Sequence, residues 1–270
     1  MISRPFIACA VQMTSTPDYE ATLSHAANLI ARAAAAGASL VGLPEHFPQI
    51  CEKQEDTAAQ AAITYPLVHA WMAEQARRHG ITLFGTTYCP DGDRVRNRLL
   101  VFDASGERIA FYDKRHLFDV ALGGQDSIRE SDVVVPGEAV TVANLGELGV
   151  LGLSICYDLR FPELYRAMKD VDIIVVPSAF TETTGKAHWE TLIRARAIEN
   201  LAYVLAPAQG GYHVNGRETH GDSMIVDPWG VVLDRLPRGS GVVSAGVNPQ
   251  YLKRLRGSLP ALKHRILHRI

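Results

Sequence analysis

The chain has 270 residues, of which 47% are hydrophobic and 21% are charged, which is typical of a globular protein with a packed core. The net charge of −2 leaves no basic surplus, so we expect neither a nucleic acid nor a membrane as partner. No stretch approaches the roughly 20 apolar residues of a membrane span, and the apolar start is too short for a signal peptide. Four widely spaced cysteines suggest no disulfide and no zinc site, so a cytoplasmic location is expected.

Predicted strands and helices alternate in the N-terminal part of the chain. Short apolar runs indicate strands, Ala- and Leu-rich helical periodicity indicates helices, and glycines end several of them. In chain order we predict strand 6–13, helix 19–36, strand 40–43, helix 67–79 and strands 81–87, 98–103 and 108–112. The Pro-Asp-Gly-Asp turn before strand 98–103, and the glycine after it, favour antiparallel neighbours.

The alternation continues to the C-terminal end. We predict a hairpin of strands 140–144 and 149–155, helix 164–169, strand 172–177, helix 186–200 and strands 202–206, 223–226, 231–234 and 242–247. This order predicts an α/β fold or a layered α-β-β-α sandwich. No linker divides the chain, so residues 1–270 should form a single domain. The polar segment 123–135 has few strand or helix cues and is interpreted as a functional loop.

One cysteine directly follows a buried apolar run. Cys156 comes after predicted strand 149–155 and before Pro162, which suits the first turn of a helix. A thiol at such a turn lies near backbone N–H groups and the positive end of a helix, which should lower its pKa. This placement is typical of a nucleophile, whereas the other three cysteines are interpreted as inert packing.

A thiolate that attacks an amide or nitrile needs a base, a donor for the oxyanion and an acid for the leaving nitrogen. Glu45 follows predicted strand 40–43, and Lys114 follows strand 108–112, so both lie at strand ends, where α/β folds place their chemistry. Each residue alone is weak evidence, because most such charged residues are simply solvated. The combination of glutamate, lysine and cysteine is more specific.

Three segments resemble the Glu-Lys-Cys triad blocks of the nitrilase superfamily. They are Leu43-Pro-Glu45, residues 112–118 around Lys114 and residues 155–164 around Cys156. Segments 129–132, 187–199 and 220–230 agree as well, so the resemblance covers nearly the whole chain. The chain is most similar to the Nit branch of aliphatic amidases, which includes ω-amidases and amidases of deaminated glutathione. The resemblance implies a four-layer α-β-β-α sandwich of the nitrilase type.

The resemblance also implies a role for each matching residue. Cys156 would be the nucleophile and Glu45 the general base. Lys114 would supply positive charge to the tetrahedral intermediate, and Glu130 matches a second glutamate beside the lysine and the substrate. The backbone N–H of Tyr157 would complete the oxyanion hole. The reaction would pass through a thioester that water opens, and neither a metal nor an organic cofactor is expected.

Substrate-binding residues are expected on the loops around the triad. Tyr157 is one candidate, and Phe180 and Thr181 are two more on loop 179–185. His188 could line the pocket, and packing at the start of a helix is an equally good interpretation. Loops 123–128 and 209–219 should also shape the pocket.

Two charged features carry structural expectations. Asp158 and Arg160 could bind a substrate carboxylate, although an ion pair that braces the turn is favoured. The basic, locally amphipathic tail 248–270 and helix 189–199 are expected at the contact of a homodimer or higher homo-oligomer, by resemblance to family members.

The predicted function is an amidohydrolase that cleaves a small linear carboxamide to an acid and ammonia. By resemblance, the expected substrate is deaminated glutathione or a related ω-amide. A nitrilase or an N-carbamoyl amino-acid amidohydrolase with the same triad is an alternative, but those enzymes typically follow the cysteine with Trp or with Asn-Asp-Arg-Arg rather than Tyr-Asp-Leu-Arg. A non-catalytic interaction protein of this fold is an alternative of another class, against which the intact triad argues.

Overall fold

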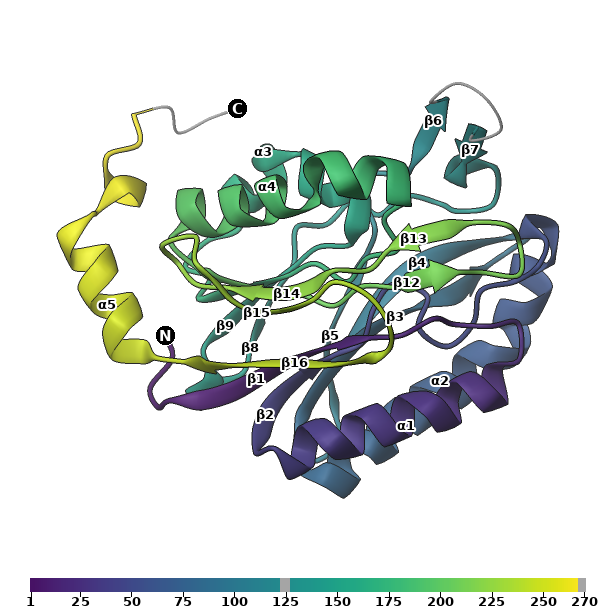
Figure 1. Cartoon of the computed structure of the whole chain (residues 1–270), viewed down its shortest axis with the longest axis horizontal. Coiled ribbons are helices and arrows are strands. Elements are labelled where there is room, and N and C mark those ends of the chain that lie inside the picture. The colour runs from purple at the N-terminus through teal and green to yellow at the C-terminus, as the bar shows by residue number, and fades with distance from the viewer. Residues whose placement is uncertain (122–126, 267–270) are drawn as a thin grey trace.

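Two six-stranded sheets lie face to face in the computed structural model, which describes residues 1–121 and 127–266. Helices α1 (Tyr19–Ala35) and α2 (Thr57–His79) cover the outer face of the first sheet. Helices α3 (Pro162–Ala167) and α4 (Glu182–Asn200) cover that of the second (Figure 1). The layers therefore follow the order α-β-β-α, and the predicted sandwich is confirmed.

Both sheets have parallel strands at their centre and antiparallel strands at their edges. The first sheet contains, in spatial order, β16 (Gly241–Val247), β1 (Phe6–Gln12), β2 (Ala38–Gly42), β3 (Thr82–Asp91), β4 (Arg94–Phe102) and β5 (Arg108–Asp113). The second contains β15 (Val232–Leu236), β14 (Ser223–Val226), β11 (Tyr203–Ala206), β10 (Ile173–Val175), β9 (Val150–Leu153) and β8 (Val142–Asn144). The hairpin predicted from residues 140–155 is the antiparallel pair β8 and β9.

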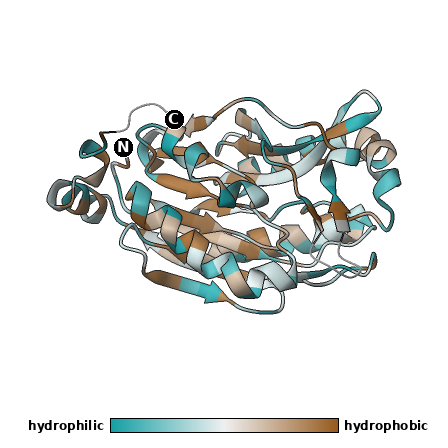
Figure 2. Ribbon diagram, turned by 90° about the horizontal axis from the view of Figure 1, so that it is seen from above, coloured by the Kyte–Doolittle hydropathy of each residue, from teal (hydrophilic) through white to brown (hydrophobic). Residues whose placement is uncertain are grey.

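Strand β1 shows how the sequence builds two cores at once. Successive side chains of a strand point to opposite faces of the sheet. Ala8 and Ala10 belong to the apolar cluster that lies between the sheets and extends to α3 and α4, whereas Cys9 and Val11 belong to the cluster under α1 and α2. The strands of the interior accordingly carry much of the hydrophobic colouring in Figure 2.

Helix α2 begins well before its predicted start. The prediction covers only residues 67–79, which start just after Pro66, a residue type that usually interrupts a helix. The observed helix runs through Pro66, which is exposed, while Thr64, Val68 and Met72 are buried on the other side. Packing of this buried face against the first sheet therefore outweighs the local cost of the proline.

Several short elements were not predicted. Two small hairpins pair β6 (Asp119–Ala121) with β7 (Ser127–Arg129) and β12 (Gly210–Tyr212) with β13 (Glu218–His220). Part of the loop predicted over 123–135 lies outside the described residues, and its remainder holds β7 and a 3₁₀ turn, Glu130–Asp132. The C-terminal tail forms α5 (Pro249–Ser258). Within the described ranges, no helix is long and apolar enough to cross a membrane.

Candidate active site

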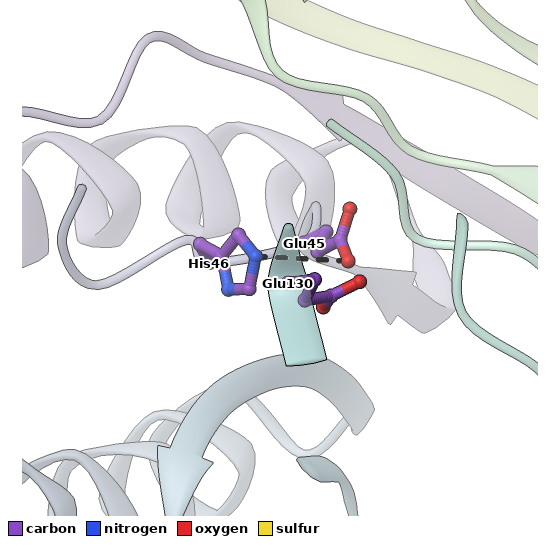
Figure 3. A group of neighbouring side chains, drawn as sticks. All are labelled: Glu45, His46 and Glu130. Atoms are coloured by element: carbon purple, nitrogen blue, oxygen red, sulfur yellow. Dashed lines mark ion pairs between the residues drawn. The ribbon is translucent and has the colours of Figure 1, made fainter. Parts of the chain in front are cut away.

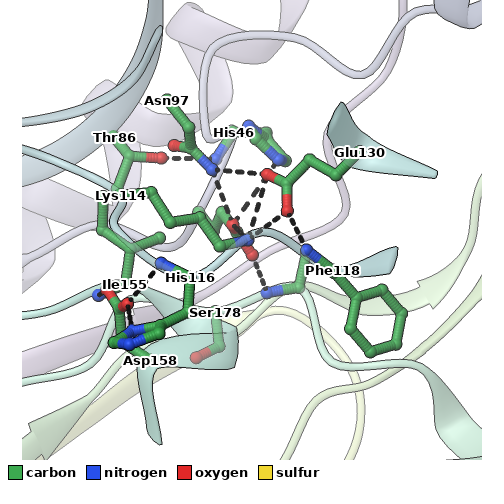
Figure 4. A network of polar contacts seen from close by, with 12 residues as sticks. His46, Thr86, Asn97, Lys114, His116, Phe118, Glu130, Ile155, Asp158 and Ser178 are labelled. Atoms are coloured by element: carbon green, nitrogen blue, oxygen red, sulfur yellow. Dashed lines mark hydrogen bonds and ion pairs between the residues drawn. The ribbon is translucent and has the colours of Figure 1, made fainter. Parts of the chain in front are cut away.

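Four strand ends from the two sheets meet at one place. Glu45 lies just beyond β2 and Lys114 directly follows β5, both in the first sheet. Cys156 lies just beyond β9, and Ala179 lies beyond β10, both in the second sheet. The structure thus brings together the three residues singled out from the sequence. Glu130 joins them from the turn after β7 and lies beside Lys114 (Figure 4).

Cys156 occupies a tight turn between β9 and the 3₁₀ segment Cys156–Arg160. Its backbone φ is +48°, a left-handed conformation that is uncommon for a residue other than glycine. The turn is fixed because the N–H of Cys156 donates to the carbonyl of Pro177 at 3.0 Å. A side chain on such a turn projects away from the strand, and that of Cys156 lines a pocket. Pro162 opens α3, as predicted.

Asp158 stabilises this turn through hydrogen bonds. Its Oδ2 accepts from the N–H of Ile155 at 2.9 Å and from the hydroxyl of Tyr112 at 2.8 Å. Its Oδ1 accepts from the N–H of His116 at 3.0 Å (Figure 4). The predicted ion pair with Arg160 is wrong, because Asp158 is fully buried and points toward the end of β5. The bracing role is correct, and it links the nucleophile's turn to the strand that carries Lys114.

Glu45 is held by donors from both sheets. Its Oε1 accepts from Asn97 Nδ2 at 2.8 Å and from Lys114 Nζ at 2.9 Å, and its Oε2 accepts from the N–H of Ala179 at 2.8 Å. Burial alone would raise its pKa, but the charge of Lys114 and the other nearby donors outweigh burial and lower the pKa to about 2. Glu45 is therefore a buried carboxylate that stays ionised.

Lys114 lies between two carboxylates. Its Nζ donates to Glu45 at 2.9 Å and to both oxygens of Glu130 at 2.9 and 3.1 Å. Glu130 is itself fixed, because its Oε2 accepts from the N–H of Phe118 at 2.7 Å. Burial acts to lower the pKa of Lys114, yet the two glutamates overcome it and raise the pKa well above its usual value. The lysine is therefore a permanent cation.

The same carboxylates form, with His46, a group whose ligand atoms lie within 4.8 Å of one another (Figure 3). Such a group could hold a metal ion by geometry alone. Here the ammonium of Lys114 already lies at hydrogen-bond distance from Glu45 and Glu130. Because a cation of the protein itself occupies this position, the arrangement favours acid–base chemistry over metal binding.

The pKa of Cys156 departs from the sequence-based expectation. Burial and the negative charge of Glu45 raise the pKa of the thiol well above its usual value, although Lys114 acts in the opposite direction. The predicted lowering of this pKa is therefore wrong, since burial beside a carboxylate outweighs the favourable turn. The resting residue is a neutral thiol, and its attack requires a base such as Glu45.

The predicted binding residues divide into two groups. Tyr157, Phe180 and Thr181 line the pocket that contains the triad. His188 does not: its Nδ1 lies 3.2 Å from Nη1 of Arg160, and it borders a separate surface depression. Its placement in the pocket is therefore wrong: His188 lies one turn beyond Thr184, the α4 residue that lines the pocket, and its side chain is exposed. Loop 179–185 lines the pocket only through its first residues and Thr184.

Three functional candidates were missed from the sequence. Asn97 is fully buried and its Nδ2 reaches both Glu45 and Glu130, at 2.8 and 3.4 Å. His46 and Arg217 line the pocket. No sequence signal marked Asn97, which lies between Arg96 and Arg98 just before predicted strand 98–103, whereas adjacency to Glu45 was the signal for His46.

Comparison with known proteins agrees with this geometry. The sequence matches the carbon–nitrogen hydrolase family over residues 7–257. The chain belongs to the carbon–nitrogen hydrolase family. It is 41% identical to the deaminated glutathione amidase of Synechocystis, over 97% of this chain and 99% of that protein. The resemblance to the Nit branch is thereby confirmed.

Solved structures of related proteins share the fold of this carbon–nitrogen hydrolase. The NitFhit protein of Caenorhabditis elegans superposes with a TM-score of 0.91 at 37% identity, over 98% of this chain and 66% of that one. A mutant of an amidase from Nesterenkonia, with acrylamide added to its active-site cysteine, has a TM-score of 0.79 at 28% identity over 94% of this chain and 98% of that one. This carbon–nitrogen hydrolase accordingly hydrolyses carbon–nitrogen bonds other than peptide bonds.

Proposed function

We propose that the chain is an amidase that hydrolyses a small linear amide bearing a carboxylate, with Cys156, Glu45 and Lys114 as its catalytic residues. The observation that carries this proposal is the position of the neutral Cys156 thiol beside the ionised, fully buried Glu45. A nucleophile needs a base within reach, and Glu45 is held in an unprotonated state by Lys114 and Asn97.

The first half of the reaction transfers the acyl group to sulfur. The Cys156 sulfur attacks the amide carbon while its proton passes to Glu45. The negative charge that develops on the carbonyl oxygen is stabilised by Lys114 and by the N–H of Tyr157. Glu45 then returns the proton to the leaving nitrogen, the carbon–nitrogen bond breaks and a thioester remains.

The second half releases the acid. Glu45 takes a proton from water, which attacks the thioester carbon, and the proton returns to the Cys156 sulfur as the carbon–sulfur bond breaks. Glu130 keeps Lys114 charged and in place throughout, because it binds the ammonium with both oxygens. The chain's own residues therefore supply every group that this sequence of steps requires.

The proposed substrate is deaminated glutathione or a related ω-amide. The support is the similarity to amidases with that name over nearly the whole chain. The two substrates differ in their leaving group: a primary ω-amide releases ammonia, whereas the amide nitrogen of deaminated glutathione belongs to cysteinylglycine, so an amine leaves. The expectation of ammonia as sole product therefore holds for the ω-amide alone.

A substrate panel tests the proposal. Purified protein is assayed with deaminated glutathione, α-ketoglutaramate, an N-carbamoyl amino acid and a nitrile. We expect turnover of at least one of the first two, and loss of that turnover in Cys156→Ala. Cys89→Ala is the matched control, because Cys89 lies outside the pocket. Turnover of the nitrile or the carbamoyl compound alone would favour the alternative enzymes, and no turnover at all would favour the non-catalytic one.

We further propose that the protein is a cytoplasmic homodimer in which α4 and the tail 248–270, whose last four residues lie outside the described ranges, meet the partner. Exposed apolar side chains support this contact: Ile198 on α4 packs beside Gly230, whose neighbours Trp229 and Val231 are 58% and 49% exposed. Light scattering should give twice the chain mass, and Trp229→Glu should reduce it to that of a monomer. The free cysteines suit a reducing compartment, which cell fractionation tests.

A further inference from the structure

The hairpin of β12 and β13 forms part of the pocket wall through Arg217. Asn215 Nδ2 donates to the carbonyl of Cys51 at 3.3 Å, and its Oδ1 accepts from the N–H of Arg217 at 3.1 Å. His213 Nδ1 lies 3.1 Å from the carbonyl oxygen of Ser15. These contacts tie the hairpin to the segment after β1 and to the segment after Glu45. The contacts of Asn215 and His213 therefore fix the position of Arg217 in the pocket wall.

Arg217 differs from the other charged groups of the pocket. Lys114, Glu45 and Glu130 are paired with one another through close hydrogen bonds. Among the residues that the structure describes, Arg217 has no carboxylate within ion-pair distance, and its buried Nε has no hydrogen-bond partner. A buried donor left without an acceptor costs free energy, and a bound acceptor such as a ligand oxygen or a water would recover that cost.

The charges of the pocket indicate a role for Arg217. Two glutamates and one lysine carry a net negative charge, which would repel an anionic substrate. Arg217 supplies the positive charge that cancels it. The charge of Arg217 also contributes to lowering the pKa of His46, although burial and Lys114 have larger effects. Arg217 and His46 both line the cavity that contains Cys156.

We propose that Arg217 binds a carboxylate of the amide substrate and so selects carboxylated amides over neutral ones. A guanidinium matches a carboxylate with paired N–H donors, which gives both affinity and orientation. Arg217 and Cys156 line the same pocket, so one substrate can contact both residues. This inference rests on the proposed amidase function, but carboxylate binding can be measured without turnover.

The first test compares charged and neutral substrates. Wild type, Arg217→Met and Arg217→Lys are assayed with glutaramate, with hexanamide as the neutral counterpart of similar length, and with pentanoyl-cysteinylglycine, whose carboxylate is on the leaving group. We expect Arg217→Met to raise KM about tenfold or more for a carboxylated substrate and to leave hexanamide unchanged. Arg217→Lys should be intermediate. The affected substrate tells whether the acyl part or the leaving group carries the carboxylate.

A matched control excludes a general effect of losing an arginine. Arg238 pairs with Glu182 and with Glu218 on the same hairpin but is not part of the pocket, so Arg238→Met should leave KM unchanged. An equal loss for hexanamide in Arg217→Met, or no change for either carboxylated substrate, would overturn the inference. Circular dichroism of each variant checks that the fold is retained.

The second test separates this inference from the proposed function. Binding of glutarate to Cys156→Ala is measured by calorimetry, with and without Arg217→Met. We expect binding that Arg217→Met weakens about tenfold or more. If glutarate binds in this way but wild type hydrolyses no amide, the proposed function fails and the inference stands. If amides are hydrolysed but neither glutarate binding nor the KM of pentanoyl-cysteinylglycine depends on Arg217, only the inference fails.

Discussion

The backbone N–H of Ala179 donates to Oε2 of Glu45 at 2.8 Å, although 134 residues separate them in the chain. Ala179 belongs to the second sheet and Glu45 to the first, so this bond crosses the interface between the layers. The other oxygen of Glu45 is held within its own sheet by Asn97 and Lys114. Each carboxylate oxygen therefore has a separate support, which fixes the side chain beside the thiol.

Replacing Glu45 with glutamine should remove the base while keeping the shape. We expect Glu45→Gln to lower kcat by about 10²–10⁴-fold, because an amide cannot take a proton from the thiol or from water. Steady-state kinetics measures the loss, and mass spectrometry of the intact protein shows whether acylation has stopped. Glu147→Gln, on the exposed surface, is the control. Activity that survived in Glu45→Gln would rule out this base.

Removing Lys114 should destabilise the fold as well as stop catalysis. Lys114→Met leaves Glu45 and Glu130 buried side by side, and breaking a buried ion pair costs about 3–5 kcal/mol. Urea unfolding at pH 8 measures this loss. Lys114→Met combined with Glu130→Gln should be clearly more stable than the sum of the two single changes implies, since it removes the repulsion. Simple additivity would show that the three groups are not coupled.

Asn97 should act as a positioning residue for both glutamates. Asn97→Ala removes the donor that reaches Glu45 and Glu130, and Asn97→Asp would add a third acidic group to the site. We therefore expect Asn97→Asp to be the more damaging change for kcat and stability at pH 8. The difference should shrink near pH 5 as carboxyl groups gain protons. If alanine were the worse replacement at pH 8, packing rather than charge would explain Asn97.

Stability should fall when the pH decreases below neutral, because His46 is buried in its neutral form. Burial lowers its pKa from 6.5 to about 4, despite the opposing effect of Glu45. Between these values the unfolded chain binds a proton that the folded protein does not, so acid favours unfolding. The loss between pH 7 and pH 5 should be about 2 kcal/mol from this group.

Urea unfolding of His46→Asn at the two pH values checks this expectation. Asparagine tolerates the left-handed backbone of residue 46, where φ is +53°, and does not titrate. The variant should therefore lose about 2 kcal/mol less than wild type on acidification. An identical pH dependence in the two proteins would mean that other groups, such as His213, account for the whole effect.

The triad could be predicted because each member follows a predicted strand and lies in a segment that resembles a nitrilase-superfamily block. Asn97 could not, since its role depends on pairing between β4 and β5: the N–H of Lys114 donates to the carbonyl of Asn97 at 2.9 Å, which sets the two side chains next to each other. The error on the thiol pKa has the same origin. The turn at Cys156 is local and readable, whereas burial and the approach of Glu45 come from the other sheet.

The layers themselves could be predicted from the alternation of helices and strands, but the short hairpins could not. Strands of three residues such as β12 and β13 carry too little pattern to be recognised, and they place Arg217. His188 shows the opposite limit. It lies on a helix whose existence was predicted, one turn beyond Thr184, which lines the pocket, but how far the pocket extends along that helix depends on contacts with other elements.

The active site lies at the interface between the two sheets, and this position affects how the protein loses function. Neither sheet contains a complete set of reacting groups, so catalysis depends on how one layer is seated on the other. A compact state that kept its secondary structure but loosened its side-chain packing would separate Glu45 from Cys156. Inactivation should then precede the loss of far-ultraviolet ellipticity during gentle denaturation. Turnover would therefore report sensitively on the position of one sheet relative to the other.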